Sequence, residues 1–173
     1  MRSLLAFLIS VLVVGTTVVA QPTTSIVGVW KISQRITPAG NPRTGGVAVT
    51  QDNPRPNILI FTRQYYSEII EMGGQPRPAA ASGSSTANPR ALTDAEKIAL
   101  YDQWRPFTAN SGTYEIAGSV LVRHPIVAKN VEVMTRGSGI PVEMKFEDAN
   151  TVWLIPTGEF ATAEPRVKLT RLE

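Results

Sequence analysis

Apolar and polar side chains alternate with a period of two along much of this chain, a pattern typical of half-buried β-strands. The alternation is cleanest over residues 140–147, where Val142, Met144 and Phe146 are separated by charged side chains. Successive side chains of a strand point to opposite faces of a sheet. The three apolar residues are therefore predicted to face a core, and the charged residues between them to face solvent.

Residues 25–37 show the same alternation close to the start of the chain. One face carries Trp30, Ile32 and Ile36, and the other carries polar side chains as far as Thr37. This segment is predicted to be a strand with one buried face.

The remaining strands are short and joined mostly by tight turns rich in glycine, proline and aspartate. About nine strands in this arrangement predict an antiparallel meander, and closing the meander into a barrel leaves no unpaired edge. A two-sheet sandwich is the alternative architecture. The other predicted strands cover residues 47–50, 57–62, 65–72, 111–117, 119–127, 131–136, 151–155 and 166–172.

One helix is predicted after residue 93. Thr93 and Glu96 have the spacing of a capping box, in which each side chain bonds a free backbone N–H of the other residue. Ile98, Tyr101 and Trp104 follow at three-residue spacing and form an apolar stripe, and a proline two residues later ends the helix. Before the helix, residues 73–92 are rich in Ala, Ser, Gly and Pro, so they are expected to form either a lid or a surface loop.

The first twenty residues resemble an export signal. Arg2 provides a positive start, an apolar run covers residues 4–14, and small residues end at Ala20. Cleavage after Ala20 would leave residues 21–173 as one mature domain in a secreted or periplasmic protein. A retained membrane anchor is the alternative, but 17 interrupted residues are at the lower limit for spanning a bilayer, so no stable membrane insertion is expected after cleavage.

Composition narrows the chemistry that this chain can perform. Its 173 residues contain no cysteine and one histidine, which excludes disulfides, thiol catalysis and any site that needs two histidines. The formal charge of +3 is spread without a basic run, so nucleic-acid binding is not expected. No carboxylate cluster, nucleophile elbow or phosphate loop is present, so neither a metal nor a cofactor is predicted.

A contact between the two ends of the domain carries the family resemblance. Trp30 follows Gly28 on the first strand, and Arg171 shares the inward face of Val167 and Leu169 on the last. A guanidinium stacked on the indole would close the floor of a barrel whose first and last strands are neighbours. In this pairing the chain resembles lipocalins, and above all the bacterial lipocalin-like domain proteins. The matching segments are residues 26–32, 59–62, 65–67, 111–115, 123–130 and 167–171.

The resemblance implies an all-β, antiparallel barrel of about eight to ten strands with one helix and an internal apolar cavity. The leading hypothesis is accordingly an exported barrel that binds a small, largely apolar molecule, with an anionic group on the ligand as an option. We expect a binding protein rather than an enzyme. Trp30 and Arg171 are assigned to barrel closure. The predicted ligand-contacting residues are Tyr65, Tyr66, Tyr114, Arg123, His124 and Phe146.

Two positions in this set are alternatives to each other. Arg123 and His124 are adjacent on a strand, so at most one of them points into the barrel. An inward Arg123 would attract an anionic head group, whereas an inward His124 could bond a ligand or act as a lone acid or base. Tyr101 and Trp104 on the helix are further candidates for lining or gating a cavity.

Two other functions stay open at this point. The barrel could be a cofactor-free isomerase or cyclase in which His124, a tyrosine or Glu115 moves a proton. It could also be an envelope protein with a packed, ligand-free interior that presents its outer surface to a partner.

Overall fold

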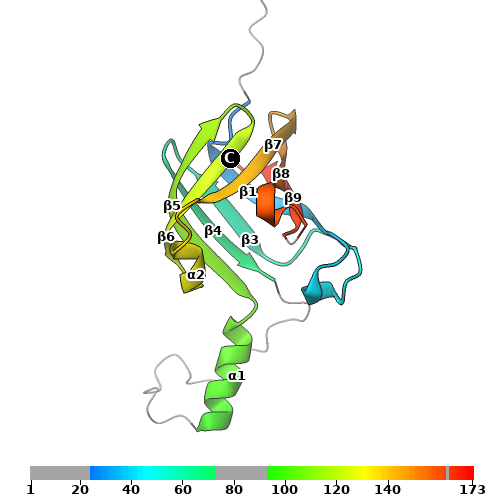
Figure 1. Ribbon diagram of the computed structural model, residues 1–173, viewed down its shortest axis with the longest axis vertical. Helices are drawn as coiled ribbons and strands as arrows, with labels where there is room; N and C mark the ends of the chain where they lie inside the picture. The colour runs from blue at the N-terminus through cyan, green and yellow to red at the C-terminus, as the bar shows by residue number, and fades with distance from the viewer. Residues whose placement is uncertain (1–23, 73–92, 163) are drawn as a thin grey trace, which may run out of the picture.

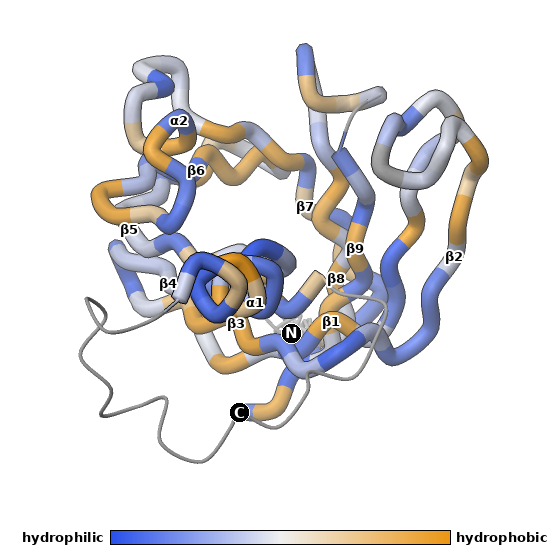
Figure 2. The backbone as a smooth tube through the Cα atoms, turned by 90° about the horizontal axis from the view of Figure 1, so that it is seen from below, coloured by the Kyte–Doolittle hydropathy of each residue, from blue (hydrophilic) through white to orange (hydrophobic). Residues whose placement is uncertain are grey.

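The strands of the protein close into an antiparallel barrel (Figure 1). The computed structural model describes residues 24–72, 93–162 and 164–173. The nine strands in these residues have the order β2-β1-β3-β4-β5-β6-β7-β8-β9, and β1 also pairs with β9. Eight strands form the closed ring, while β2 pairs only with the far half of β1 and lies beside it, outside the ring, in Figure 2. The predicted barrel is confirmed, and the two-sheet sandwich is excluded.

Most predicted strands are present with small changes in their ends. The strands are β1 (Gly28–Thr37), β2 (Val49–Asp52), β3 (Asn57–Phe61), β4 (Tyr65–Glu71), β5 (Phe107–Ala117), β6 (Val120–Ala128), β7 (Ile140–Asp148), β8 (Thr151–Pro156) and β9 (Arg166–Arg171). The helices are α1 (Asp94–Trp104), α2 (Val131–Met134) and the short 3-10 turns η1 (Pro42–Thr44) and η3 (Gly158–Phe160).

Inward-facing apolar residues of the strands form one core. In β7, Val142 is buried, Met144 and Phe146 pack against the core, and the charged residues between them are exposed, as the alternation predicts. The core continues around the ring through β1, β3, β4, β6, β8 and β9. Its buried members are Ile26, Trp30, Ile32, Leu59, Phe61, Tyr66, Leu121, Val142, Val152, Leu154 and Leu169.

The ring closes where the first strand meets the last. Trp30 is the register partner of Arg171, whose guanidinium lies 4.1 Å from the centre of the indole ring. The buried indole N–H donates to the Ile26 carbonyl at 2.7 Å, which draws residues 24–27 across this end of the barrel. The contact expected between the two ends of the domain is therefore present.

A β-bulge exchanges the inward and outward faces of β1 partway along the strand. The register with β9 shifts between Ile32 and Gln34, so one extra residue is inserted there. Beyond the bulge, Arg35 is opposite Val167, which packs against the core, and Thr37 is buried. The prediction that Thr37 belongs to the polar outer face is wrong. It assumed uninterrupted alternation along the strand, whereas one inserted residue reverses the face of every position that follows it.

The strand predicted over residues 131–136 is also wrong. The segment forms α2, a single helical turn that begins at the N-cap Asn130, whose side chain accepts a hydrogen bond from the Glu132 N–H at 3.1 Å. Val131 and Val133 alternate with polar residues as in a strand, but the cap offers the backbone a local partner in place of a neighbouring strand.

The helix α1 begins and ends as predicted, but its packing differs. The capping box is complete: the Thr93 hydroxyl accepts from the Glu96 N–H, and the Glu96 carboxylate accepts from the Thr93 N–H. The apolar stripe of Ile98, Tyr101 and Trp104 is exposed, because the helix extends away from the barrel (Figure 1). The predicted lid segment, residues 73–92, lies outside the described residues.

Candidate functional site

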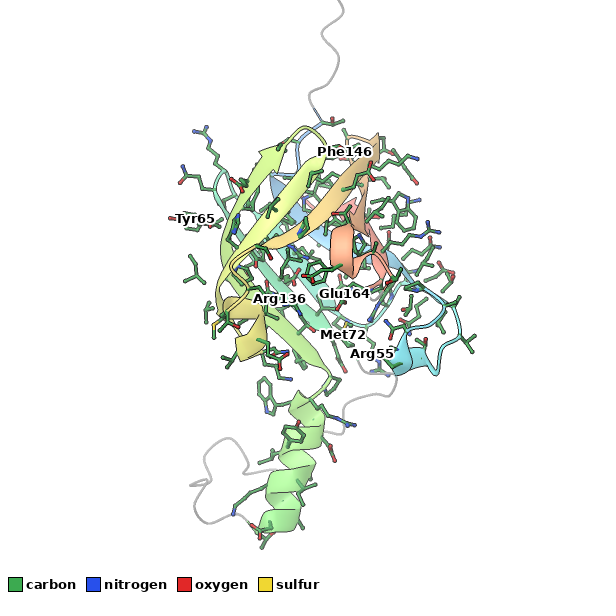
Figure 3. All side chains as sticks on the ribbon, viewed as in Figure 1. Arg55, Tyr65, Met72, Arg136, Phe146 and Glu164 are labelled. Carbon is green, nitrogen blue, oxygen red and sulfur yellow. The ribbon has the colours of Figure 1, made fainter. Side chains whose placement is uncertain are left out.

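A cavity of about 720 Å³ lies at the end of the barrel opposite α1. It is bounded by residues 24–27, by the hairpin that joins β5 to β6, and by β7. Exposed residues on its rim show that the cavity opens to solvent. Figure 3 shows Phe146 at this end of the barrel. The apolar lining consists of Ile26, Val27, Tyr114, Ile116, Met144 and Phe146.

The walls of the cavity come from the inward faces of β5 and β7. Tyr114 contacts the ring of Phe61 edge-on at 5.6 Å, and its hydroxyl donates to the Thr62 carbonyl. Burial raises the pKa of Tyr114, so this phenol stays neutral at physiological pH. Two charged side chains of opposite sign also belong to the lining, and small or polar residues make up the rest: Arg63 and Glu115, with Thr24, Ser25, Gly118 and Ser119. The arrangement suits an apolar body held among aromatic and aliphatic side chains.

A buried polar cluster lies deeper in the same barrel. Arg123 on β6 and Glu68 on β4 form an ion pair at 2.5 Å, with 14% and 8% of their side chains exposed. Asn110 on β5 donates to the other oxygen of Glu68, also at 2.5 Å. The Arg123 guanidinium lies 5.8 Å from the centre of the Tyr66 ring. Burial is the main cause that raises the pKa of Tyr66 to about 12; Arg123 opposes this rise and Glu68 adds to it.

The structure decides between Arg123 and His124. Arg123 points into the barrel, where Glu68 compensates its charge, whereas His124 is on the outer face of β6. The imidazole is 40% exposed, and its Nε2 lies 3.2 Å from a carboxylate oxygen of Glu115. His124 shares its face of β6 with Val120 and Val122, and that face is the outer one. The outward position of His124 therefore does not support the hypothesis of a proton-transferring histidine inside the barrel.

The predicted contact residues fall into three groups. Tyr114 and Phe146 line the cavity, and Tyr66 and Arg123 belong to the polar cluster. Tyr65 is exposed and points away from the barrel in Figure 3, as His124 does on its own strand.

Several residues of the cavity were not singled out by sequence reasoning. Ile26 and Val27 contribute because the chain crosses the barrel end before β1 begins, and Arg63 contributes from the turn between β3 and β4. No period or motif marks these positions, since they depend on how loops meet at one end of the ring. No motif marks Glu68, so its pairing with Arg123 was not predicted from the sequence.

Two other features that would indicate a function are absent from the described residues. These residues contain no group of three or more His, Cys, Asp or Glu side chains that could hold a metal ion. Within the same ranges, no helix is long and apolar enough to cross a membrane.

The strand order and the closure by Trp30 and Arg171 define the architecture. The fold is a closed, antiparallel β-barrel, the architecture that the resemblance to lipocalin-like proteins implied. No protein-family model matches the chain, and no curated protein matches it either.

Two solved structures are similar in architecture. A lipocalin-like protein from Bacteroides uniformis is 12% identical, with a TM-score of 0.42, over 84% of this chain and 97% of that protein. An uncharacterized protein from Bacteroides eggerthii is 8% identical, with a TM-score of 0.41, over 84% of this chain and 98% of that protein.

Proposed function

We propose that this protein is a binding barrel that holds a small, largely apolar molecule in the cavity at the Trp30–Arg171 end. The cavity carries the proposal: its volume of about 720 Å³ is within the range of roughly 300–1,000 Å³ that is usual for small-ligand sites. Inward-facing side chains of two barrel strands supply its walls, so burying an apolar ligand there would extend the core of the barrel.

The charged residues at the site limit where an acidic group on the ligand could lie. Arg123 is not available to an anion, because Glu68 already occupies it at 2.5 Å. Arg63 is the cation in the cavity lining, and it is exposed. An acidic group on the ligand would therefore lie at the solvent-facing rim, where its attraction to Arg63 is screened by water and salt.

The proposed location is outside the cytoplasm. Residues 1–20 have the order of an export signal, with a positive start, an apolar run and small residues before the cut. N-terminal sequencing of the protein recovered from the envelope or medium should read Gln21 first. Recovery with Met1 intact would contradict this part of the proposal.

Titration with a neutral fluorescent probe, N-phenyl-1-naphthylamine, tests the binding function. Ile116→Arg places a charge in the cavity lining at a residue that is already half exposed, so it should reduce probe affinity about tenfold or more without removing core packing. Ile126→Arg is the matched control, since Ile126 is exposed on β6 and is not part of the lining. Equal affinity in both variants, or no binding by the unmodified protein, would reject the cavity as the site.

A further inference from the structure

The polar cluster inside the barrel contains buried atoms that have no hydrogen-bond partner among the described residues. They include the Tyr66 hydroxyl, Asn110 Oδ1 and Arg123 Nε. Tyr66 and Asn110 are 2% and 8% exposed, so water at the surface does not reach these atoms. Leaving such groups unpaired in a folded protein costs about 1–3 kcal/mol each. Three of them around one ion pair form a set of unused hydrogen-bonding positions.

The unused positions comprise two donors and one acceptor. The Tyr66 O–H and the Arg123 Nε–H donate, and Asn110 Oδ1 accepts, because the amide nitrogen of Asn110 is already bonded to Glu68. A group that both accepts and donates hydrogen bonds matches this set. Carboxamides and hydroxy-carbonyl compounds have that combination, whereas a carboxylate only accepts.

The charges around the cluster cancel. Glu68 neutralises Arg123, so the ion pair at the centre of the cluster has no net charge. An anion placed here would be an uncompensated charge in a poorly solvated interior, which is strongly unfavourable. The cluster is therefore suited to an uncharged polar group.

We propose that Tyr66, Asn110 and Arg123 form a binding point for an uncharged, hydrogen-bonding head group of the carboxamide or hydroxy-carbonyl class. Aromatic rings lie next to this point: Phe61 stacks on Tyr66 with centroids 6.3 Å apart and contacts Tyr114 of the cavity wall. These ring contacts connect the binding point to the wall of the cavity. The inference rests on the proposed function and specifies the class of ligand.

The experiment compares two probes with the same chain, octanamide and octanoate, by competition against N-phenyl-1-naphthylamine on the full protein. Octanamide should bind about tenfold tighter than octanoate, as one well-placed buried hydrogen bond predicts. Tyr66→Phe should abolish this preference while keeping the ring. Tyr65→Phe, which removes a hydroxyl from the outer face of the same strand, should leave the preference intact.

A second measurement reports on the cluster itself. In a ¹⁵N spectrum, octanamide should shift the Arg123 Nε–H and Asn110 side-chain signals in the unmodified protein. Equal affinities of the two probes, or an unchanged preference in Tyr66→Phe, would show that the cluster holds water or serves structure only. That result would overturn the inference and leave the proposed function standing, whereas failure of every probe to bind would overturn both.

Discussion

Glu68 and Arg123 face each other across the barrel interior, and their pairing explains how two charged side chains can be buried there. The direct contact at 2.5 Å and the additional hydrogen bond from Asn110 offset the loss of hydration. Such a pair contributes little net stability compared with well-packed apolar residues, but each partner depends on the other. A change to one residue of this pair is therefore a change to the charge balance of the interior.

Replacing Glu68 by Gln tests this dependence. The substitution removes the negative charge and leaves the Arg123 guanidinium buried without its counterion, which typically costs about 3–5 kcal/mol of unfolding free energy. Urea unfolding followed by circular dichroism would measure the loss. Glu147→Gln is the control, because Glu147 pairs with Lys168 on the outside of the barrel, where water can replace the partner. Similar losses in both variants would contradict the account.

Tyr66 makes the stability of the protein sensitive to alkaline pH. Burial favours the neutral phenol and raises the pKa of Tyr66 to about 12. Stabilisation from the neutral form is complete below the ordinary tyrosine pKa of 10.0 and is lost as the pH rises from there through 12. Unfolding free energies measured across this window should fall more steeply in the unmodified protein than in Tyr66→Phe. Parallel pH profiles would refute the prediction.

Elements, unlike single residues, were largely predictable from the sequence. Alternation placed the strands, and the capping box placed the start of α1, because both are local patterns. The errors have local causes too: a bulge between Ile32 and Gln34 reversed the faces of β1, and Asn130 capped a helical turn where a strand was expected.

Which face of a strand points inward was harder to predict than the strand itself. On β6 the two faces both mix apolar residues with one basic or titratable side chain, so Arg123 and His124 could not be distinguished by period alone. The position of α1 relative to the barrel could not be predicted from local pattern either. Its apolar stripe of Ile98, Tyr101 and Trp104 is typical of a helix that packs on a core, but in the structure the stripe is exposed.

A lysine side chain joins the end of α1 to the barrel. Lys129, just after β6, donates to the carbonyls of Trp104, Arg105 and Phe107, where the helix ends. Lys129→Met should therefore increase hydrogen exchange in residues 94–104 several-fold and leave exchange in the barrel strands unchanged, because α1 buries no residue in the core. Lys97→Met, which removes an exposed pair with Asp94 inside the helix, is the control. Equal exchange in the two variants would mean that Lys129 does not hold the helix.

The molecule as a whole depends on joining strands that are far apart in the sequence. Arg171 on β9 donates to the carbonyls of Ser25, Val27 and Ala149 at 2.5–3.1 Å and also covers the Trp30 ring. The same end of the barrel carries the cavity, so barrel closure and the proposed binding site share their scaffold. This end is also where the sequence was least informative about the site, because loops from several parts of the chain meet there.

Gly28→Ala should weaken this closure more than an ordinary loop substitution. Gly28 has φ of +145°, and an added Cβ would lie 2.3 Å from Arg171 Nη1 and 2.5 Å from the Glu173 carbonyl oxygen. Strain of this kind costs roughly 1–3 kcal/mol, and moving Arg171 would also disturb its carbonyl contacts. Gly137→Ala is the control, since a Cβ there meets nothing within 4 Å. Denaturation curves should show a large loss for the first variant and almost none for the second. If Gly28→Ala were as stable as Gly137→Ala, Arg171 could shift freely, and the contact between the two ends would not be what keeps the barrel closed.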